Sequence, residues 1–253
     1  MSMVFSEKLM KDMVAWDVHT WSKGILFWDE VLDKIYPDGQ VGGDDPVGGD
    51  DPIGGDTHIV PTALDIGAGG GGISLYLGLR GFKVTCSDLS LGEKTERAKA
   101  LHGEYGVQGQ ITYEAVDATR MGYADGTFDV VAFKSVLGGV GRDGNDDRIR
   151  AAMDEIYRVL KVGGMFVFCE NVEGSALHGF FRRSFVRWGR SWNYLTPGFV
   201  EGMLGRFAEH EVRTYGFLNC FMKNNAVVGR VDEWVCNRIK PERMYMCYGW
   251  GRK

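Results

Sequence analysis

Short apolar runs alternate along the chain with stretches whose apolar residues recur at helical spacing. The first clear run is 62–66, bounded by Pro61 and a series of glycines, and an apolar helical pattern follows it to about residue 79. Further runs fit buried strands at 83–87, 111–116, 128–133, 165–169, 211–217 and 244–250. Helical patterns separate most of them, at about 92–103, 146–160, 197–207 and 225–239. This order predicts an α/β fold with a doubly wound sheet of seven strands, six parallel and the last antiparallel.

The segment before the first strand has a different pattern. Residues 4–36 show helical spacing, with a second helix expected at 20–36, and they are rich in aromatic side chains such as Trp16 and Trp21. Two interpretations are open. The helices can form a layer packed on the sheet, or they can be a lid over a ligand site that turns His19 and Lys23 toward a substrate. We expect residues 1–59 to form such a lid plus a loop, and 60–253 the main domain.

A glycine-rich turn follows the first strand. Gly67, Gly69 and Gly72 have the G-x-G-x-x-G spacing, which lets the backbone approach a ligand closely and would also suit a dinucleotide. Asp65 precedes the first glycine by two residues, at the ligand end of the strand. A carboxylate there repels a pyrophosphate and attracts an ammonium or sulfonium group.

The stretch 63–74 therefore resembles motif I of the class I S-adenosylmethionine-dependent methyltransferases, Asp/Glu-x-Gly-x-Gly-x-Gly, with one extra glycine at the end. The helix at 146–160, the Leu-Lys-x-Gly-Gly turn at 160–164 and the strand after it match the same family, so the resemblance covers about residues 60–170. It implies a Rossmann-like doubly wound sheet and S-adenosyl-L-methionine as cofactor, with S-adenosyl-L-homocysteine as product.

The cofactor-binding residues that we expect lie at the ends of successive strands. Asp88 follows Asp65 by 23 residues (88 − 65), close to the spacing typical of a ribose-binding carboxylate, although it could also cap the next helix. By resemblance, Asp117 and Ala118 hold the adenine, and Lys134 and Ser135 border the methyl group. The complete predicted set is Asp65, Gly67, Ala68, Gly69, Asp88, Leu89, Asp117, Ala118, Lys134 and Ser135.

The reaction expected is methyl transfer to a small-molecule or glycan acceptor, with oxygen as the preferred atom. Positioning supplies much of the acceleration, and a base is needed only if the acceptor must lose a proton. His19, His178 and Glu170 are the candidate bases, and each could equally be a hydrogen-bonded structural residue. The alternatives are N-methylation of a small molecule or protein, a nicotinamide (NAD) oxidoreductase, and a binding module without transfer.

A basic and aromatic segment follows the fifth expected strand. In 177–192, arginines alternate with phenylalanines and tryptophans, and we expect a helical cap at about 174–195. Such a segment could contact a membrane surface, bind an anionic or lipid-linked substrate such as a phosphate-linked sugar, or cover the substrate site with buried aromatics and solvated arginines. Nucleic acid is disfavoured, because the formal net charge of the whole chain is −5.

Composition narrows the remaining possibilities. The five cysteines are scattered without C-x-x-C spacing, which favours a reducing compartment and argues against a zinc site or disulfides. We expect no metal, although the Gly-Gly-Asp repeat at 41–56 weakly resembles calcium-binding repeats. A surface loop is the simpler interpretation of this repeat. The first twelve residues lack a signal-peptide core, and no run has the length of a membrane span. We expect a cytoplasmic protein, with peripheral contact at the inner membrane face as an option.

Overall fold

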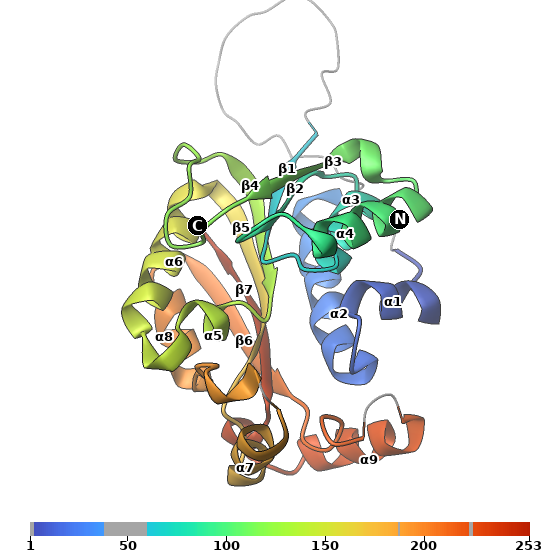
Figure 1. Ribbon diagram of the computed structural model, residues 1–253, viewed down its shortest axis with the longest axis vertical. Helices are drawn as coiled ribbons and strands as arrows, with labels where there is room; N and C mark the ends of the chain where they lie inside the picture. The colour runs from blue at the N-terminus through green and yellow to red at the C-terminus, as the bar shows by residue number, and fades with distance from the viewer. Residues whose placement is uncertain (1–2, 38–59, 187, 223–224) are drawn as a thin grey trace, which may run out of the picture.

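The computed structural model describes residues 3–37, 60–186, 188–222 and 225–253 (Figure 1). Its centre is a seven-stranded sheet in the order β3-β2-β1-β4-β5-β7-β6. The strands are β1 (Thr62–Ile66), β2 (Lys83–Asp88), β3 (Ile111–Ala115), β4 (Phe128–Lys134), β5 (Leu160–Asn171), β6 (Glu209–Tyr215) and β7 (Met246–Arg252). Only β7 runs antiparallel to its neighbours, β5 and β6. The predicted doubly wound sheet with six parallel strands and one antiparallel strand is confirmed. The repeat at 41–56 lies outside the described residues.

Helices cover both faces of the sheet, because its central strands are apolar on both sides. Figure 1 shows α1 (Glu7–Val14), α2 (Val18–Ile35), α3 (Gly72–Leu79) and α4 (Glu93–Glu104) on one side. On the other side lie α5 (Leu137–Val140), α6 (Asp146–Val159) and α8 (Pro197–Leu204). The helices α7 (Ala176–Phe185) and α9 (Ala226–Cys236) lie together beyond one end of the sheet. Each face has its own cluster of buried apolar side chains.

The two N-terminal helices take different places. Helix α2 is part of the layer on the sheet, and its Trp21 and Trp28 side chains are fully buried there. Helix α1 packs on α3 instead, and its last turn approaches so closely that a Cβ on Gly72 would overlap the carbonyl oxygen of Met13. The layer interpretation therefore describes α2, whereas α1 lies against the glycine turn. The division into domains at residue 59 stays a prediction.

Two elements differ from the expected boundaries by five residues or more. Strand β5 begins at Leu160 because Leu160 pairs with Phe128 before a register shift, five residues earlier than the apolar run 165–169 suggests. The helical cap ends at Phe185, well before residue 195, and a short 3₁₀ turn, Trp188–Arg190, follows. Val186 has extended backbone angles, which end the helix. The segment after α7 can therefore fold back toward the sheet, where Leu195 bridges to Val172.

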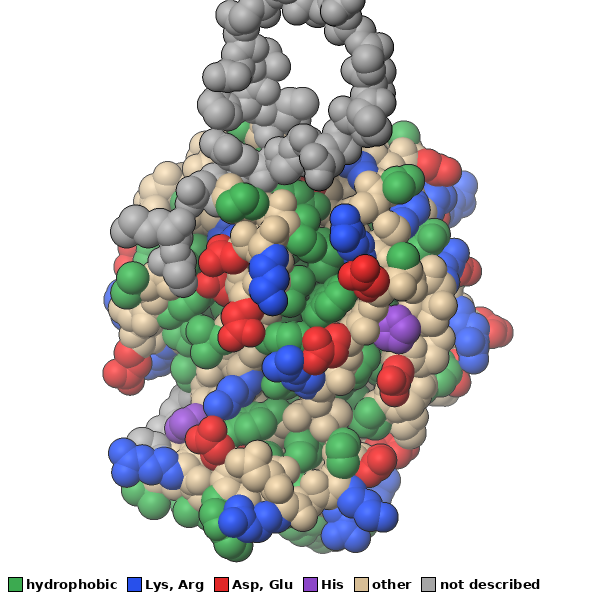
Figure 2. Space-filling view, turned by 180° about the vertical axis from the view of Figure 1, so that it is seen from behind, with side chains coloured by type: hydrophobic (Ala, Val, Ile, Leu, Met, Phe, Trp, Pro, Cys, Tyr) green, Lys and Arg blue, Asp and Glu red, His purple; other side chains and the backbone are tan. Residues whose placement is uncertain are grey.

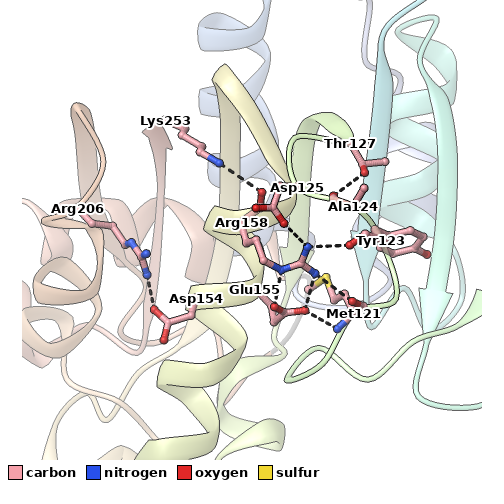
Figure 3. Close-up of polar contacts among 10 residues, drawn as sticks. All are labelled: Met121, Tyr123, Ala124, Asp125, Thr127, Asp154, Glu155, Arg158, Arg206 and Lys253. Atoms are coloured by element: carbon pink, nitrogen blue, oxygen red, sulfur yellow. Dashed lines mark hydrogen bonds and ion pairs between the residues drawn. The ribbon is translucent and has the colours of Figure 1, made fainter.

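One polar network ties the start of β4 to α6 (Figure 3). The Arg158 guanidinium donates to Glu155, to Asp125 at 2.8 Å, and to the carbonyl oxygens of Tyr123 (2.7 Å) and Met121 (3.0 Å). These hydrogen bonds raise the pKa of Arg158, and the bond to Glu155 has a larger effect than the bond to Asp125. The network lies at the amino end of β4, so it stabilises the fold at the end of the strand opposite Lys134.

Charged side chains are interspersed over the face seen in Figure 2. Lys and Arg lie among Asp and Glu there, without a continuous field of one sign. The expectation that nucleic acid is disfavoured stays a prediction.

Candidate functional site

A cavity of about 250 Å³ opens at the carboxyl ends of β1 and β4. The position is the switch point of a doubly wound sheet, where β1 lies between β2 and β4 and ligands characteristically bind. Its walls come from the end of α1, the glycine turn, the start of α3 and the last residue of β4. The lining residues are Asp12, Met13, Ala15, Asp65, Gly67, Ala68, Gly69, Gly70, Gly72, Ile73 and Lys134.

The glycine turn is held in place by β2 and by the end of β4. The Ala68 N–H donates to the carbonyl oxygen of Ser87 at 2.7 Å. Gly67 has a φ of +63°, and a Cβ there would lie 2.7 Å from Cγ2 of Val136. Only glycine combines this backbone angle with so close a neighbour. The turn therefore has a fixed shape that leaves space on its cavity side.

Asp65 supplies the only fully buried carboxylate of this cavity within the described residues. Its Oδ2 accepts hydrogen bonds from the Ser74 N–H (2.8 Å) and the Ser74 hydroxyl (2.7 Å). Its Oδ1 is buried and has no hydrogen-bond partner among the described residues. Burial raises the pKa of Asp65 to about 7, against the opposing effect of the Ser74 bonds. A buried acceptor without a partner fits a ligand that carries a hydrogen-bond donor, above all a cationic one.

Lys134 places a positive charge in the same cavity. Its Nζ lies 4.8 Å from the centre of the Trp21 ring, and it forms no ion pair with any described carboxylate. Burial lowers its pKa, while Cys169, Asp65 and Glu170 act in the opposite direction. The cavity thus offers a carboxylate oxygen and a separate ammonium group. This pair is complementary to the α-ammonium and α-carboxylate of an amino acid, which is the methionine end of S-adenosylmethionine.

The other predicted acids follow at the neighbouring strand ends. Asp88 ends β2, and its Oδ1 accepts the Leu89 N–H at 2.8 Å. Asp117 follows β3, and its Oδ1 accepts two hydrogen bonds from Thr119, which lower its pKa. Leu89 is 70% exposed, while Ala118 is buried. These residues do not line the 250 Å³ cavity, so their contacts to ribose and adenine stay predictions.

A second cavity, of about 130 Å³, lies next to the first. Ala15 lines the first cavity and the adjacent Trp16 lines the second, so the turn between α1 and α2 borders both. At the sheet, the Asn171 side chain donates to the Ser135 hydroxyl at 2.7 Å, which joins the ends of β5 and β4. The lining residues of the second cavity are Trp16, Asn171, His178, Phe181, Arg182, Val186, Tyr194, Cys220, Phe221 and Tyr245.

Comparison with known proteins agrees with this geometry. Residues 64–168 match the methyltransferase domain family, which spans β1 to β5. A demethylmenaquinone methyltransferase of Leptospira interrogans is 37% identical over 107 residues, which cover 41% of this chain and 40% of that protein. Residues 64–168, about two fifths of the chain, are therefore similar to the class I S-adenosylmethionine-dependent methyltransferase domain. A sarcosine/dimethylglycine N-methyltransferase of Aphanothece halophytica is 33% identical over 112 residues, covering 44% of this chain and 38% of that one.

The chain also resembles solved structures in fold. The phosphoethanolamine N-methyltransferase 2 of Haemonchus contortus, solved with phosphomonomethylethanolamine and S-adenosylhomocysteine, superposes with a TM-score of 0.53 at 22% identity. The alignment covers 76% of this chain and 49% of that one. The chain spans about two fifths of the length of the curated relatives that it matches. The match to the family thus extends from β1 to β5 and includes no residue after 168.

The three predicted bases lie in different places. Glu170 is fully buried, and its carboxylate accepts the N–H groups of Val136 (2.8 Å), Leu137 (2.7 Å) and Asn171 (2.9 Å). Burial raises its pKa to about 7. His19 packs against Gly229 of α9 and lines neither cavity. Glu170 therefore holds the start of α5, and neither Glu170 nor His19 lines the second cavity.

His178 is the predicted base that lines the second cavity. Its Nδ1 accepts the Ser175 N–H at 3.0 Å, and its Nε2 lies 2.8 Å from the carbonyl oxygen of Phe217, so we assign the proton to Nε2. Its ring stacks on Phe221 with centres 5.2 Å apart. Burial lowers its pKa. With both ring nitrogens hydrogen bonded, His178 contributes a neutral wall to the cavity, and its role as a base stays a prediction.

Sequence reasoning missed the contact that holds the turn between α1 and α2 over both cavities. The Tyr245 hydroxyl donates to the Asp17 carboxylate and lies 2.7 Å from the Thr20 hydroxyl. All three residues are buried, and Tyr245 lines the second cavity. Burial raises the pKa of Asp17 and of Tyr245. Residues 17 and 245 are 228 positions apart, so no local motif could have indicated this pair.

No described helix has both the length and the apolar character to cross a membrane. Among the described residues, no group of three or more histidines, cysteines and acids is arranged to hold a metal ion.

Proposed function

We propose that this protein transfers a methyl group from S-adenosylmethionine to a small-molecule acceptor in the 130 Å³ cavity. The observation that carries the proposal is the pair of opposite charges on the glycine-turn cavity. Oδ1 of Asp65 would accept the ammonium of the methionine end, and Lys134 would bind its carboxylate. A pyrophosphate would bind this cavity poorly, because the buried carboxylate of Asp65 repels it.

The remaining cofactor contacts follow from the strand-end residues. Asp88 would accept hydrogen bonds from the ribose hydroxyls, and Asp117 with the Ala118 N–H would hold the adenine edge. Gly67, Ala68 and Gly69 would let the backbone lie close to the methionine portion. When bound, the sulfonium supplies a methyl group that is already activated, so the protein's share is to bind, to orient and to exclude water.

We propose oxygen as the accepting atom. The acceptor cavity is lined by one arginine and by no carboxylate, so a protonated amine would meet repulsion there. Trp16 and Tyr245 would keep water away from the acceptor, and the bond between Asn171 and Ser135 would fix the wall nearest the methyl group. N-methylation of a small molecule or protein is the alternative within the family, and the relatives include an N-methyltransferase.

Calorimetric titration with S-adenosylhomocysteine and with NAD⁺ and NADH tests the cofactor. We expect saturable one-to-one binding of S-adenosylhomocysteine and no heat of binding from either nicotinamide nucleotide. A protein that retains NADH and ignores S-adenosylhomocysteine at millimolar concentration would contradict the proposal. Transfer of tritiated methyl groups from S-adenosylmethionine to a cell extract then separates an enzyme from a binding module that lacks transfer.

We also propose peripheral membrane contact through the outer face of α7. Leu177, Phe180 and Phe185 are 53%, 61% and 68% exposed, and Arg183 beside them is exposed as well. Such a face favours anionic bilayers.

Co-sedimentation with phosphatidylglycerol vesicles should recover the protein, and the double change F180E/F185E should abolish most of the recovery. Val162→Glu, at the other end of the sheet and 92% exposed, is the matched control and should leave recovery unchanged. Equal recovery of all three proteins would exclude this contact.

A further inference from the structure

Arg182 is a positive charge without a charged partner on the acceptor cavity. Its Nη1 donates to the carbonyl oxygens of Val172 (2.6 Å) and Glu173 (3.1 Å), and its Nη2 to that of Tyr245 (3.3 Å). It forms no ion pair with any described carboxylate, whereas the buried Arg80 pairs with Asp29. Backbone carbonyls orient a guanidinium but leave its net charge uncompensated. Burial accordingly lowers the pKa of Arg182.

The guanidinium is also held flat and in one orientation. Its central carbon lies 4.0 Å from the centre of the Tyr194 ring, so that ring covers one of its faces. Three of its five N–H groups have the backbone partners above, which leaves two for a ligand. The Tyr194 hydroxyl is buried on the same cavity and has no hydrogen-bond partner among the described residues. Arg182 and Tyr194 thus both line this cavity, and each has a hydrogen-bond donor without a partner among the described residues.

The rest of the cavity suits a flat apolar body. Aromatic rings make up half of its lining, from Trp16, Phe181, Tyr194, Phe221 and Tyr245. Its volume of about 130 Å³ is near that of the ~150 Å³ cavity known to bind benzene. No aspartate or glutamate lines it. A ligand of one aromatic ring with an anionic substituent would match its size, its walls and its charge.

We propose that the acceptor binds as an anion, with a carboxylate or similar oxyanion on Arg182 and the Tyr194 hydroxyl and a ring-sized apolar body between the aromatic side chains. This inference rests on the proposed function, because it assigns the 130 Å³ cavity to the acceptor. Arg183 and Arg190 have no such part, because both are exposed and line neither cavity. Among the described arginines of this basic segment, Arg182 alone lines the cavity.

Fluorine NMR titration with 4-fluorobenzoate and 4-fluorobenzamide, which differ in charge but hardly in shape, tests the inference with and without saturating S-adenosylhomocysteine. We expect the benzoate to bind the wild-type protein at least ~10-fold more tightly than the benzamide, as a charge-assisted bond requires. Arg182→Met should reduce this ratio to below ~3, and Arg183→Met should leave it unchanged. Equal binding of the two probes, no binding of the benzoate at 20 mM, or an unchanged ratio in Arg182→Met would overturn the inference.

The two proposals can fail separately. If S-adenosylhomocysteine binds and the wild-type protein does not distinguish benzoate from benzamide, the anion site is excluded and the cofactor assignment stands. If the benzoate is preferred through Arg182 and S-adenosylhomocysteine does not bind, the anion site stands without the methyltransferase function. Because Arg182 also orders the carbonyls of residues 172 and 173, its methionine variant can lose the fold, and the wild-type ratio then decides alone.

Discussion

Replacing Asp65 by asparagine should weaken the binding of S-adenosylhomocysteine by about 10- to 100-fold. The amide oxygen of asparagine can still accept both bonds from Ser74, so the local structure is kept. What changes is Oδ1, where an NH₂ group replaces the buried oxygen that would accept the cofactor's ammonium. Hydrogen bonds to charged groups contribute about 1.5–3 kcal/mol, and each ~1.4 kcal/mol is tenfold in affinity. Calorimetry at pH 8 measures the change.

The same substitution should stabilise the protein in the absence of cofactor. Burial raises the pKa of Asp65 to about 7, whereas an unfolded aspartate has a pKa of about 3.9. Between these pH values the folded state binds the proton of Asp65 more tightly than the unfolded state does. The free energy of unfolding therefore falls as the pH rises from about 4 to about 7, and it falls no further from this cause above pH 7. Asparagine does not titrate in this range, so in Asp65→Asn the free energy of unfolding does not fall in this way as the pH rises. The melting temperature of this variant should exceed that of the wild type at pH 8, and the gap should narrow toward pH 4.

Asp129 offers a matched control for the change at Asp65. Its buried carboxylate binds Thr62 at the start of β1 and Lys161 at the start of β5, at the end of the sheet opposite the cavity. Asp129→Asn should lower the melting temperature and leave the affinity for S-adenosylhomocysteine unchanged. An unaltered affinity in Asp65→Asn would show that this carboxylate does not bind the cofactor's ammonium.

Gly72→Ala should lower the free energy of unfolding by about 1–3 kcal/mol, the usual cost of forcing extra atoms into a packed interior. The added Cβ would overlap the backbone carbonyl of Met13, and a backbone atom of a packed helix cannot rotate away as a side chain can. Helix α1 must therefore shift from the glycine turn, which opens the wall that it gives to the cofactor cavity. Urea unfolding of the protein without cofactor measures the loss, and limited proteolysis of the N-terminal segment reports the release of α1.

Gly70→Ala is the matched variant in the same turn. A Cβ at Gly70 has no neighbour within 4 Å, so the free energy of unfolding should stay within about 0.5 kcal/mol of the wild type, as for most surface changes. Equal stability of Gly72→Ala and Gly70→Ala would mean that α1 does not pack on the glycine turn as described.

More residues of the proposed cofactor site than of the proposed acceptor site could be predicted from the sequence. Asp65 is two residues before a glycine turn, and Asp88 ends the next strand, so local spacing alone gave both positions. The segment 177–192 offered four arginines in a row of aromatics, and nothing local distinguished Arg182 from Arg183. Which one faces the cavity depends on where α7 ends and on Tyr194, a residue beyond the helix.

The sequence by itself determined the seven-stranded sheet and the ends of β1, β2 and β3 where acids lie, because strand patterns and glycine turns are properties of short stretches. Only the tertiary structure decided what closes the site. Helix α1 packs against Gly72, and the Tyr245 hydroxyl donates a hydrogen bond to Asp17. Arg182 binds backbone carbonyls and forms no ion pair with a described carboxylate. Each of these facts joins segments that lie far apart in the chain, and packing distances between such segments are set by the folded core as a whole and by no local pattern of residues.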